Sequence, residues 1–468
     1  MRMAGERSRS CRGAAGLAFA IRCLFPAGLC AAGLLTLAAA TSHGEIAMTQ
    51  MPNGVRLIVK PTRANRILAI SCYFNTGSYF ERPEESGITS FVCRTMLKGT
   101  RTRTALEIAA ALEEVGGEIF AAAGEDFSEV STISIVEDID VALDALRDVI
   151  LHPTFPPDEV EKEREAILAA IRRQEDSAFQ YTYRHFRELL YAGHPYARPV
   201  LGTAETVAGL TQAQLVRSHA NTFTASNLLV IVVGDVEPES VARKIAAAFA
   251  ELPAGRMGYV LASKRFRPRA RRKTLEKEVE QAFIIAGFPT DRATSPDYPA
   301  LKVACAILGT SGSMSTRLFR ELRDKRGLAY AVGSSLPTLR EKSHYFAYIG
   351  TKPESIEAAR AGLLEVIRGL IEGPLPAEEL ERAKTFLIGQ FRIAHQRNSA
   401  QADFLALYEM VGLGARFDEQ YPARIRQVTA EQVKAAAAKY FRSPTITILQ
   451  PPRQRQPLIQ RIDKAGAR

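Results

Sequence analysis

Cysteine is scarce in this chain of 468 residues, and its distribution excludes a disulfide scaffold. Three of the six cysteines lie within the first forty residues, and the others, Cys72, Cys93 and Cys305, stand far apart. An odd number of distant cysteines forms no disulfide framework, and none of them belongs to a CxxC metal pair. Cys72 alternates with apolar residues as in a strand, and Cys305 falls in an apolar helical run. Both are therefore predicted to be core residues.

The body of the chain also lacks an excess of charge. Of the formal net charge of +10, about +4 belongs to the first forty residues and another +4 to the tail after Gln450. The small remainder does not favour binding to nucleic acid. The chain has 46% apolar and 24% charged residues, which is typical of a globular protein. Its length requires at least two domains.

Long apolar runs are absent except near the start. Arginine-rich residues 1–22 precede the apolar run Cys23–Ala40, which ends in three alanines. A basic start, an apolar run and a small-residue cleavage site predict a secretory signal peptide over residues 1–40, and therefore export, to the periplasm of a bacterium. An uncleaved anchor is the alternative, because about eighteen apolar residues just span a bilayer. The glycines and the proline of this run favour cleavage, after which no membrane span is expected.

Two helical segments recur at nearly one offset. In each copy of one pair, a threonine or proline precedes an acidic turn of the kind that starts a helix. A strand pattern follows the other pair in both copies, at Asn227–Val236 and Thr445–Leu449. Two matches at similar offsets predict two homologous halves. The matched pairs are Gly209–Phe223 with Gln427–Phe441, and Pro156–Lys162 with Pro376–Arg382, at offsets of 218 and 220.

The predicted fold class is α+β, with two homologous halves that each form a mainly antiparallel sheet with helices packed on one face. The halves are placed at residues 46–250 and 275–450, separated by a basic, proline-containing linker over 251–274 and followed by a basic tail over 451–468. The expected strands include Arg66–Thr76, Glu129–Val136, Glu280–Phe288 and Ser343–Thr351, and the expected helices include Ala105–Val115, Asp140–Ile150, Pro157–Gln174 and Glu357–Ile371.

One segment of the first half carries a recognisable motif. Gly87–Thr100 reads GITSFVCRTMLKGT and resembles the zinc-binding helix of the pitrilysin/insulinase-type metallopeptidases, the inverzincins. Their signature, H-x-x-E-H, places two histidines on one helix face and a glutamate that activates water. Those three positions hold Ser90, Cys93 and Arg94 here. The resemblance also implies a glutamate ligand on a later helix, where this chain has Ala170.

None of these positions keeps the chemistry of zinc catalysis. Serine is a poor zinc ligand, alanine is none, and Arg94 puts a fixed positive charge where the cation would sit. Phe120 stands where the family often has an asparagine that lines the cleft. No metal site and no catalytic residue are therefore predicted in this chain.

The second half retains its part of the resemblance. Leu308–Ser334 matches the family's glycine-rich loop, helix and arginine/tyrosine segment. The resemblance implies that Arg323 and Tyr330 project into the cleft and hold the substrate backbone, as guanidinium and phenol donors suit a peptide carbonyl. Spacing alone favours a surface arginine and a half-buried tyrosine. Gly309–Gly312 lacks the spacing and the lysine of a phosphate-binding loop, so a helix-entry turn is expected there.

The leading hypothesis is a non-catalytic, substrate-clamping subunit of an exported heterodimeric zinc peptidase. The resemblance implies a homologous partner subunit that supplies the zinc, while this chain holds no cofactor and clamps peptide substrates. The alternative is a structural scaffold of the same fold with no role in proteolysis. A third hypothesis makes Cys93 a nucleophile with a pKa lowered by Arg94, but no histidine stands at helical spacing to act as its base.

Overall fold

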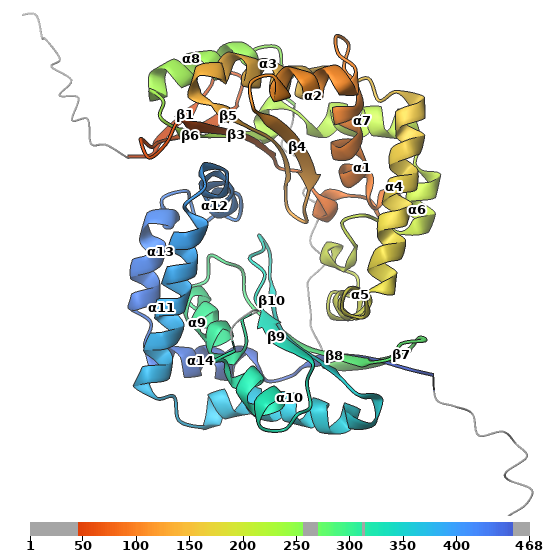
Figure 1. Ribbon diagram of the computed structural model, residues 1–468, viewed down its shortest axis with the longest axis vertical. Helices are drawn as coiled ribbons and strands as arrows, with labels where there is room; N and C mark the ends of the chain where they lie inside the picture. Colours follow the sequence, from red (N-terminus) through yellow and green to blue (C-terminus); the bar gives the residue numbers. More distant parts are fainter. Residues whose placement is uncertain (1–44, 256–269, 311–313, 453–468) are drawn as a thin grey trace, which may run out of the picture. The chain divides into compact units, whose positions relative to one another are not determined.

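The computed structural model describes residues 45–255, 270–310 and 314–452, which form two β-sheets with their helices (Figure 1). The predicted leader, most of the predicted linker and nearly all of the basic tail lie outside the described residues. Over the described ranges, no helix combines the length and the apolar character needed to cross a bilayer.

The first half is built on a six-stranded sheet with the strand order β1-β2-β6-β3-β5-β4. All neighbouring strands are antiparallel except the parallel pair β2 and β6. β6 is an unbroken apolar run because it lies inside the sheet with both faces buried. The strands are β1 (Ala47–Gln50), β2 (Arg56–Pro61), β3 (Ile67–Phe74), β4 (Glu118–Ala123), β5 (Ser128–Ile135) and β6 (Leu228–Gly234).

The helices of the first half begin at clear sequence signals. Thr104 with Glu107 and Thr211 with Gln214 form capping boxes that satisfy free backbone N–H groups at the starts of α2 and α7. The helices are α1 (Ile88–Thr95), α2 (Ala105–Glu113), α3 (Ile139–Leu151), α4 (Pro157–Asp176), α5 (Ala178–Leu190), α6 (Ala204–Gly209), α7 (Gln212–Thr222) and α8 (Pro238–Ala248). Short 3-10 helices are η1 (Ser78–Phe80), η2 (Pro83–Glu85), η3 (Met96–Lys98), η4 (Val136–Asp138), η5 (Pro195–Ala197) and η6 (Ala225–Asn227).

The second half has a five-stranded sheet with the order β7-β11-β8-β10-β9, in which only β7 and β11 are parallel. Its strands are β7 (Arg271–Glu276), β8 (Ala282–Pro289), β9 (Ala331–Ser335), β10 (His344–Thr351) and β11 (Thr445–Gln450). Its helices are α9 (Tyr298–Leu308), α10 (Ile356–Glu372), α11 (Ala377–Ala394), α12 (Asn398–Met410), α13 (Phe417–Arg426) and α14 (Ala430–Tyr440), with a π-helical segment η7 (Phe319–Asp324) and the 3-10 helix η8 (Pro353–Ser355).

The structure confirms the two-half α+β fold, and the repeated segments form the same elements in both halves. α7 and α14 each start at a threonine–glutamine capping box and each precede an inner strand, β6 or β11. α4 and α11 each begin directly after a proline. All the expected strands and helices are present. β7, however, begins at Arg271, inside the segment predicted as linker.

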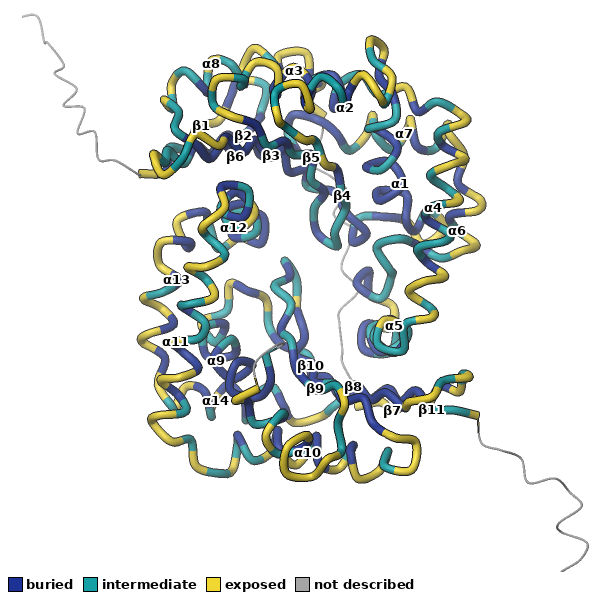
Figure 2. Tube along the Cα trace, in the orientation of Figure 1, coloured by how far each residue is buried: buried dark blue, intermediate teal, exposed yellow. Residues whose placement is uncertain are grey.

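The halves exchange a helix, which the sequence reasoning did not anticipate. One face of each sheet packs on its own helices and forms the main core of its half. The opposite face of the first sheet packs against α12 of the second half, and the opposite face of the second sheet packs against α5 of the first half. Side chains of a strand alternate between faces, so inner strands such as β6 and β8 are buried on both faces (Figure 2), whereas the edge strands β1 and β7 are largely exposed.

Candidate functional site

The helix α1, which carries the degenerate zinc motif, starts at a glycine that no other residue replaces easily. Gly87 has φ 94°, and a β-carbon there would lie 2.5 Å from the carbonyl oxygen of Leu201. The buried carboxylate of Glu81 accepts hydrogen bonds from the backbone N–H groups of Gly87 (2.8 Å) and Thr89 (3.0 Å). Burial raises the pKa of Glu81 to about 6, against the lowering effect of these hydrogen bonds. Glu81 thus satisfies N–H groups at the start of α1 and is committed to that task.

Two of the three motif positions on α1 are closed to solvent. Ser90 is 5% exposed and Cys93 is fully buried in the core of the first half. Burial raises the pKa of Cys93 to about 12, so the thiol stays protonated at neutral pH. The burial of this thiol and the pairing of Arg94 with Glu163 argue against the hypothesis of a Cys93 thiolate activated by Arg94.

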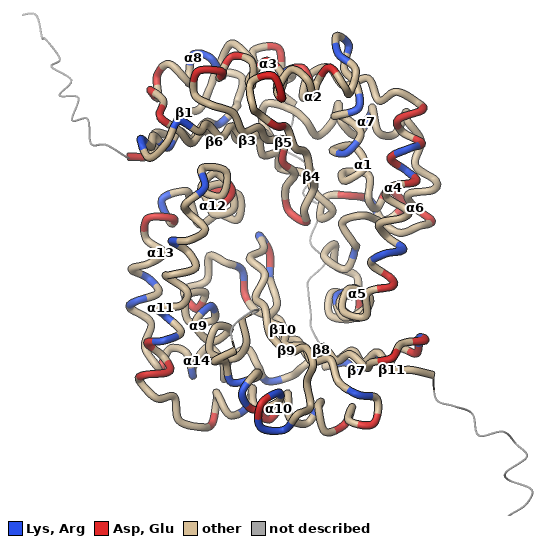
Figure 3. The backbone as a smooth tube through the Cα atoms, viewed as in Figure 1, with Lys and Arg blue, Asp and Glu red and all other residues tan. Residues whose placement is uncertain are grey.

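The third position, Arg94, is neutralised within the fold. Its Nε lies 2.9 Å from a carboxylate oxygen of Glu163 on α4, and Lys98 Nζ lies 3.0 Å from the other oxygen. Glu163 is only 12% exposed, so this three-residue group is a partly buried ion network rather than a surface pair. α4 carries acidic and basic residues along its length (Figure 3). The role of Glu163 as the counter-ion of Arg94 was not predicted from the sequence.

The residues around α1 do not fit a zinc ion. Ala170 lies on α4, which packs against α1, and has no ligand atom. Of the first-motif side chains, one is a hydroxyl, one a protonated thiol and one a guanidinium already paired with Glu163. Zinc needs several deprotonated N, O or S ligands in a tetrahedral arrangement. Throughout the described ranges, no group of three or more His, Cys, Asp or Glu side chains is arranged to hold a metal.

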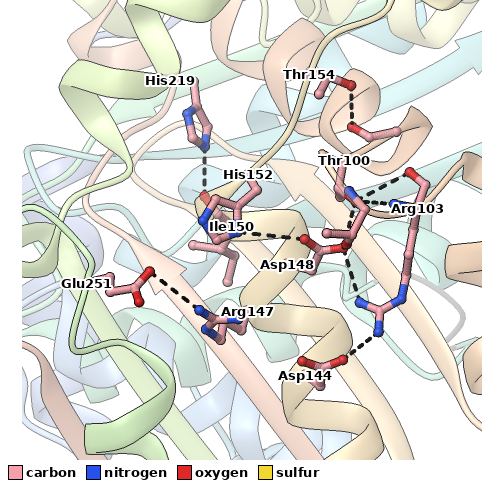
Figure 4. Close-up of polar contacts among 12 residues, drawn as sticks. Thr100, Arg103, Asp144, Arg147, Asp148, Ile150, His152, Thr154, His219 and Glu251 are labelled. Atoms are coloured by element: carbon pink, nitrogen blue, oxygen red, sulfur yellow. Dashed lines mark hydrogen bonds and ion pairs between the residues drawn. The ribbon is translucent and has the colours of Figure 1, made fainter.

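The segment that follows α1, which contains Gly99 and Thr100, has a structural role. Asp148 on α3 is buried and accepts hydrogen bonds from Thr100 Oγ1 (2.6 Å) and Thr102 Oγ1 (2.8 Å) and an ion pair from Arg103 (3.1 Å), as Figure 4 shows in part. Thr154 Oγ1 also donates to the backbone carbonyl of Gly99 (3.1 Å). Thr100 is thus fixed to α3 and Gly99 to Thr154, so these residues have structural partners that do not depend on a metal.

The edge strand of the first sheet, β4, also lacks the polar group that the family resemblance implies. Phe120 on β4 is 55% exposed, although most phenylalanines of a folded chain are buried. Being the last strand in its sheet, β4 leaves one row of backbone groups without a strand partner among the described residues.

Arg323 and Tyr330 come together in the second half. Arg323, in the π-helical segment η7, donates from Nη1 to the backbone carbonyl of Tyr330 (3.2 Å) and lies over the ring of Phe319. Tyr330 directly precedes the edge strand β9, and its backbone N–H donates to Gly350 O (3.1 Å). A β-carbon on Gly350 would lie 2.3 Å from the Tyr330 ring, so this glycine makes room for the ring.

Both side chains remain available to a ligand. Tyr330 is 42% exposed and Arg323 is exposed. Partial burial raises the pKa of Tyr330, so its hydroxyl is a donor at neutral pH. Within the part of the chain that the structure describes, the Tyr330 hydroxyl makes no hydrogen bond and Arg323 makes no ion pair with a carboxylate. The glycine-rich turn before this segment falls partly on residues 311–313, outside the described residues.

Two family patterns match the chain. A pattern described as "Insulinase (Peptidase family M16)" matches residues 56–204, and one described as "Peptidase M16 inactive domain" matches residues 209–387. Together they extend over more than half of the chain.

Known proteins of similar sequence and fold agree with these patterns. An uncharacterized zinc protease of Streptomyces coelicolor is 28% identical over 88% of this chain and 91% of its own length, and one of Bacillus subtilis is 26% identical over 83% and 94%. The crystal structure of a peptidase M16 inactive domain from Pseudomonas fluorescens has a TM-score of 0.82 and 24% identity, covering 88% of this chain and all of that one. A protease from Helicobacter pylori has a TM-score of 0.81 and 20% identity, covering 87% and 100%. The two structures are similar to this chain in fold.

Proposed function

Because the chain belongs to the M16 (insulinase) family of peptidases, we propose that it is a non-catalytic, substrate-clamping subunit of an exported heterodimeric zinc peptidase. One observation carries the proposal: Arg94 occupies a zinc-ligand position and is ion-paired with Glu163, whereas Arg323 and Tyr330 keep free donors. A chain that neutralises its former metal position internally cannot activate water there, yet it retains groups that bind a peptide backbone.

The proposed task of this chain is to hold the substrate. Arg323 and Tyr330 offer N–H and O–H donors to a peptide carbonyl, and their mutual contact fixes their spacing. The zinc, its water and its glutamate base belong to a homologous partner subunit of the same fold. Related proteins that match this chain over more than 90% of their own length are described as zinc proteases, which supports a role in proteolysis.

The place of action is proposed from the sequence of the leader. Residues 1–40 have the pattern of a signal peptide, and export to the periplasm is the corresponding location.

Reconstitution tests this function. The chain would be purified alone and together with the product of a neighbouring reading frame that has an intact H-x-x-E-H motif. We expect the chain alone to bind no stoichiometric zinc and to cleave no unfolded peptide, and the mixture to cleave. Zinc content by mass spectrometry and cleavage of a quenched fluorescent peptide are the measurements.

Two outcomes contradict the proposal. Chelator-sensitive cleavage by the chain alone contradicts the non-catalytic role. Co-purification with a membrane complex that lacks peptidase activity favours the scaffold alternative and contradicts substrate clamping.

A further inference from the structure

A pocket with several arginines lies beside α5, and its lining includes none of the zinc-motif positions and neither Arg323 nor Tyr330. Its volume is about 130 Å³, enough for a small chemical group rather than a whole peptide. Four lining residues lie on one face of α5, since they are spaced i, i+3, i+4 and i+7. The lining residues are Gln180, Tyr183, Arg184 and Arg187 on α5, Gln174 on α4, and Ala197, Arg198, Pro199, Val200 and Leu201 after α5.

The pocket lining has three arginines and no acidic residue. Arg187 is nearly buried and is held by Glu125 (2.7 Å from Nη1) and by the backbone carbonyl of Tyr196 (2.9 Å from Nη2). Its charge is therefore balanced by one carboxylate outside the lining. Its Nε atom is buried and has no acceptor among the described residues.

The other two arginines differ from each other. Arg184 has two carboxylates near it, because it lies 3.4 Å from Glu175 and 4.0 Å from Glu188. Arg198 donates from Nη2 to the backbone carbonyls of Ser78 and Tyr79 (3.1 Å each).

Arg198 forms no ion pair with any carboxylate of the described residues, and its Nε is buried without an acceptor. The nearest acidic influence is Glu81, whose two oxygens already bind the start of α1. Among the arginines of the pocket lining, Arg198 is thus the one with carbonyl acceptors but no carboxylate partner in the described residues, and an oxyanion in the pocket supplies such a partner.

The rest of the lining limits the kind of anion. The lining also includes the apolar residues Ala197, Pro199, Val200 and Leu201. A phosphate or sulfate ion is polar on every side and gains nothing from apolar neighbours, whereas an aliphatic carboxylate presents oxygen atoms on one side and carbon atoms on the other.

We propose that this pocket binds the terminal carboxylate of a peptide whose last residue is apolar. The carboxylate lies against Arg198 and Arg184, and the apolar side chain lies against Val200 and Leu201. This inference does not rest on the proposed function, because binding is a property of the chain alone and needs neither zinc nor a partner.

Isothermal titration calorimetry on the isolated full chain tests the inference, with N-acetyl-leucine, N-acetyl-leucinamide and inorganic phosphate as ligands. We expect N-acetyl-leucine to bind with a Kd of about 1 mM, a common affinity for so small a ligand, and the amide to bind at least about tenfold more weakly. Arg198→Gln is expected to weaken binding of the acid by roughly ten- to a hundredfold, as loss of a charge-assisted hydrogen bond does.

Matched variants keep the test decisive. Arg184→Gln has no hydrogen bond to a backbone carbonyl to lose, and it should also weaken binding of the acid. If Arg198→Gln does not fold, Arg184→Gln therefore provides the test. Arg172→Gln, on α4 outside the pocket lining, should leave binding unchanged. Equal affinity for acid and amide, tighter binding of phosphate than of N-acetyl-leucine, or no binding of the acid up to about 10 mM each overturns the inference. None of these results touches the proposed function, which is tested by zinc content and peptide cleavage, for the chain alone and for its mixture with the partner.

Discussion

The two halves of this chain share one architecture but treat the polar residues of their family motifs in opposite ways. In the first half, the charged residue of the former metal helix, Arg94, is paired with Glu163, and its neighbour Cys93 is buried. In the second half, Arg323 and Tyr330 contact each other but keep donors free. The motif of the first half satisfies its polar groups within the fold, whereas that of the second half leaves donors open to a ligand.

The two exchanged helices differ as well. α5 meets the second sheet through aromatic side chains, such as Phe186, Phe283 and Phe346. α12 meets the first sheet through small and aliphatic side chains, such as Ala402 and Leu405. Each helix covers a sheet face of the opposite half, so these two interfaces, rather than the cores of the halves, hold the chain together as one unit.

The largest effect is expected on the free energy of unfolding, when a buried side chain is removed from either of these two interfaces. Phe186 is fully buried, and a β-carbon on Gly287 would lie 2.1 Å from its ring, so ring and strand fit closely. Phe186→Ala should lower the free energy of unfolding by about 3–5 kcal/mol, and Leu405→Ala in the other interface by about 2–5 kcal/mol. Urea unfolding followed by circular dichroism measures both.

The shape of those transitions sharpens the comparison. If the halves depend on the exchanged helices, each variant should retain one cooperative transition at lower urea. A biphasic transition in which one half unfolds unaffected would show that the interfaces are dispensable.

The second prediction compares the paired arginine with the unpaired one. In the complex with a zinc-bearing partner, Arg323→Ala combined with Tyr330→Phe should lower kcat/KM by roughly a hundredfold, as loss of donors to a reacting carbonyl does. Arg94→Ala should leave kcat/KM unchanged and change the free energy of unfolding by less than about 1 kcal/mol, since its ion pair is partly exposed. Equal losses in both variants would remove the distinction between the halves.

The third prediction concerns pH: lowering the pH should destabilise the α5 interface and stabilise the α12 interface. His344, in the α5 interface, is fully buried between the hydroxyls of Tyr191 (2.9 Å) and Tyr183 (3.1 Å). Burial lowers the pKa of His344 to about 3. Between that value and the ordinary pKa of about 6.5, the unfolded chain binds more protons than the folded chain, so stability falls as the pH falls.

Glu129, which faces α12, behaves in the opposite direction. Burial raises its pKa, with Asp403 of α12 adding to the shift. Between its ordinary pKa of about 4.5 and the raised value, the folded chain binds more protons than the unfolded chain. The contribution of Glu129 to the stability of the folded state therefore rises as the pH falls. Hydrogen exchange at pH 5 and pH 7 should therefore show that α5 loses protection relative to α12 in acid. In His344→Gln this difference should shrink, and an unchanged difference would exclude His344 as its cause.

The sequence predicted the elements of the fold better than their assembly. Capping threonines, alternating strands and the repeat are local patterns, so α7, α14, β6 and β11 could be located from residues alone. The exchange of α5 and α12 depends on contacts between distant segments, for which periodicity gives no signal. The loss of the zinc ligands was visible in the sequence, but the pairing of Arg94 with Glu163 needed the relative placement of α1 and α4.

The smallest expected effect concerns Cys93, the thiol of the motif. Burial raises its pKa to about 12 and excludes reagents, so iodoacetamide should not label it in the folded chain at pH 7.5. Cys72 and Cys305 are also buried free thiols and serve as internal controls, because all three should become labelled together in urea. Cys93→Ala should therefore leave the activity of the complex unchanged. Selective labelling of Cys93 in the native chain, with loss of activity, would show that the motif of the first half has kept a reactive site. The contrast between a closed motif in the first half and an open motif in the second half would then no longer hold.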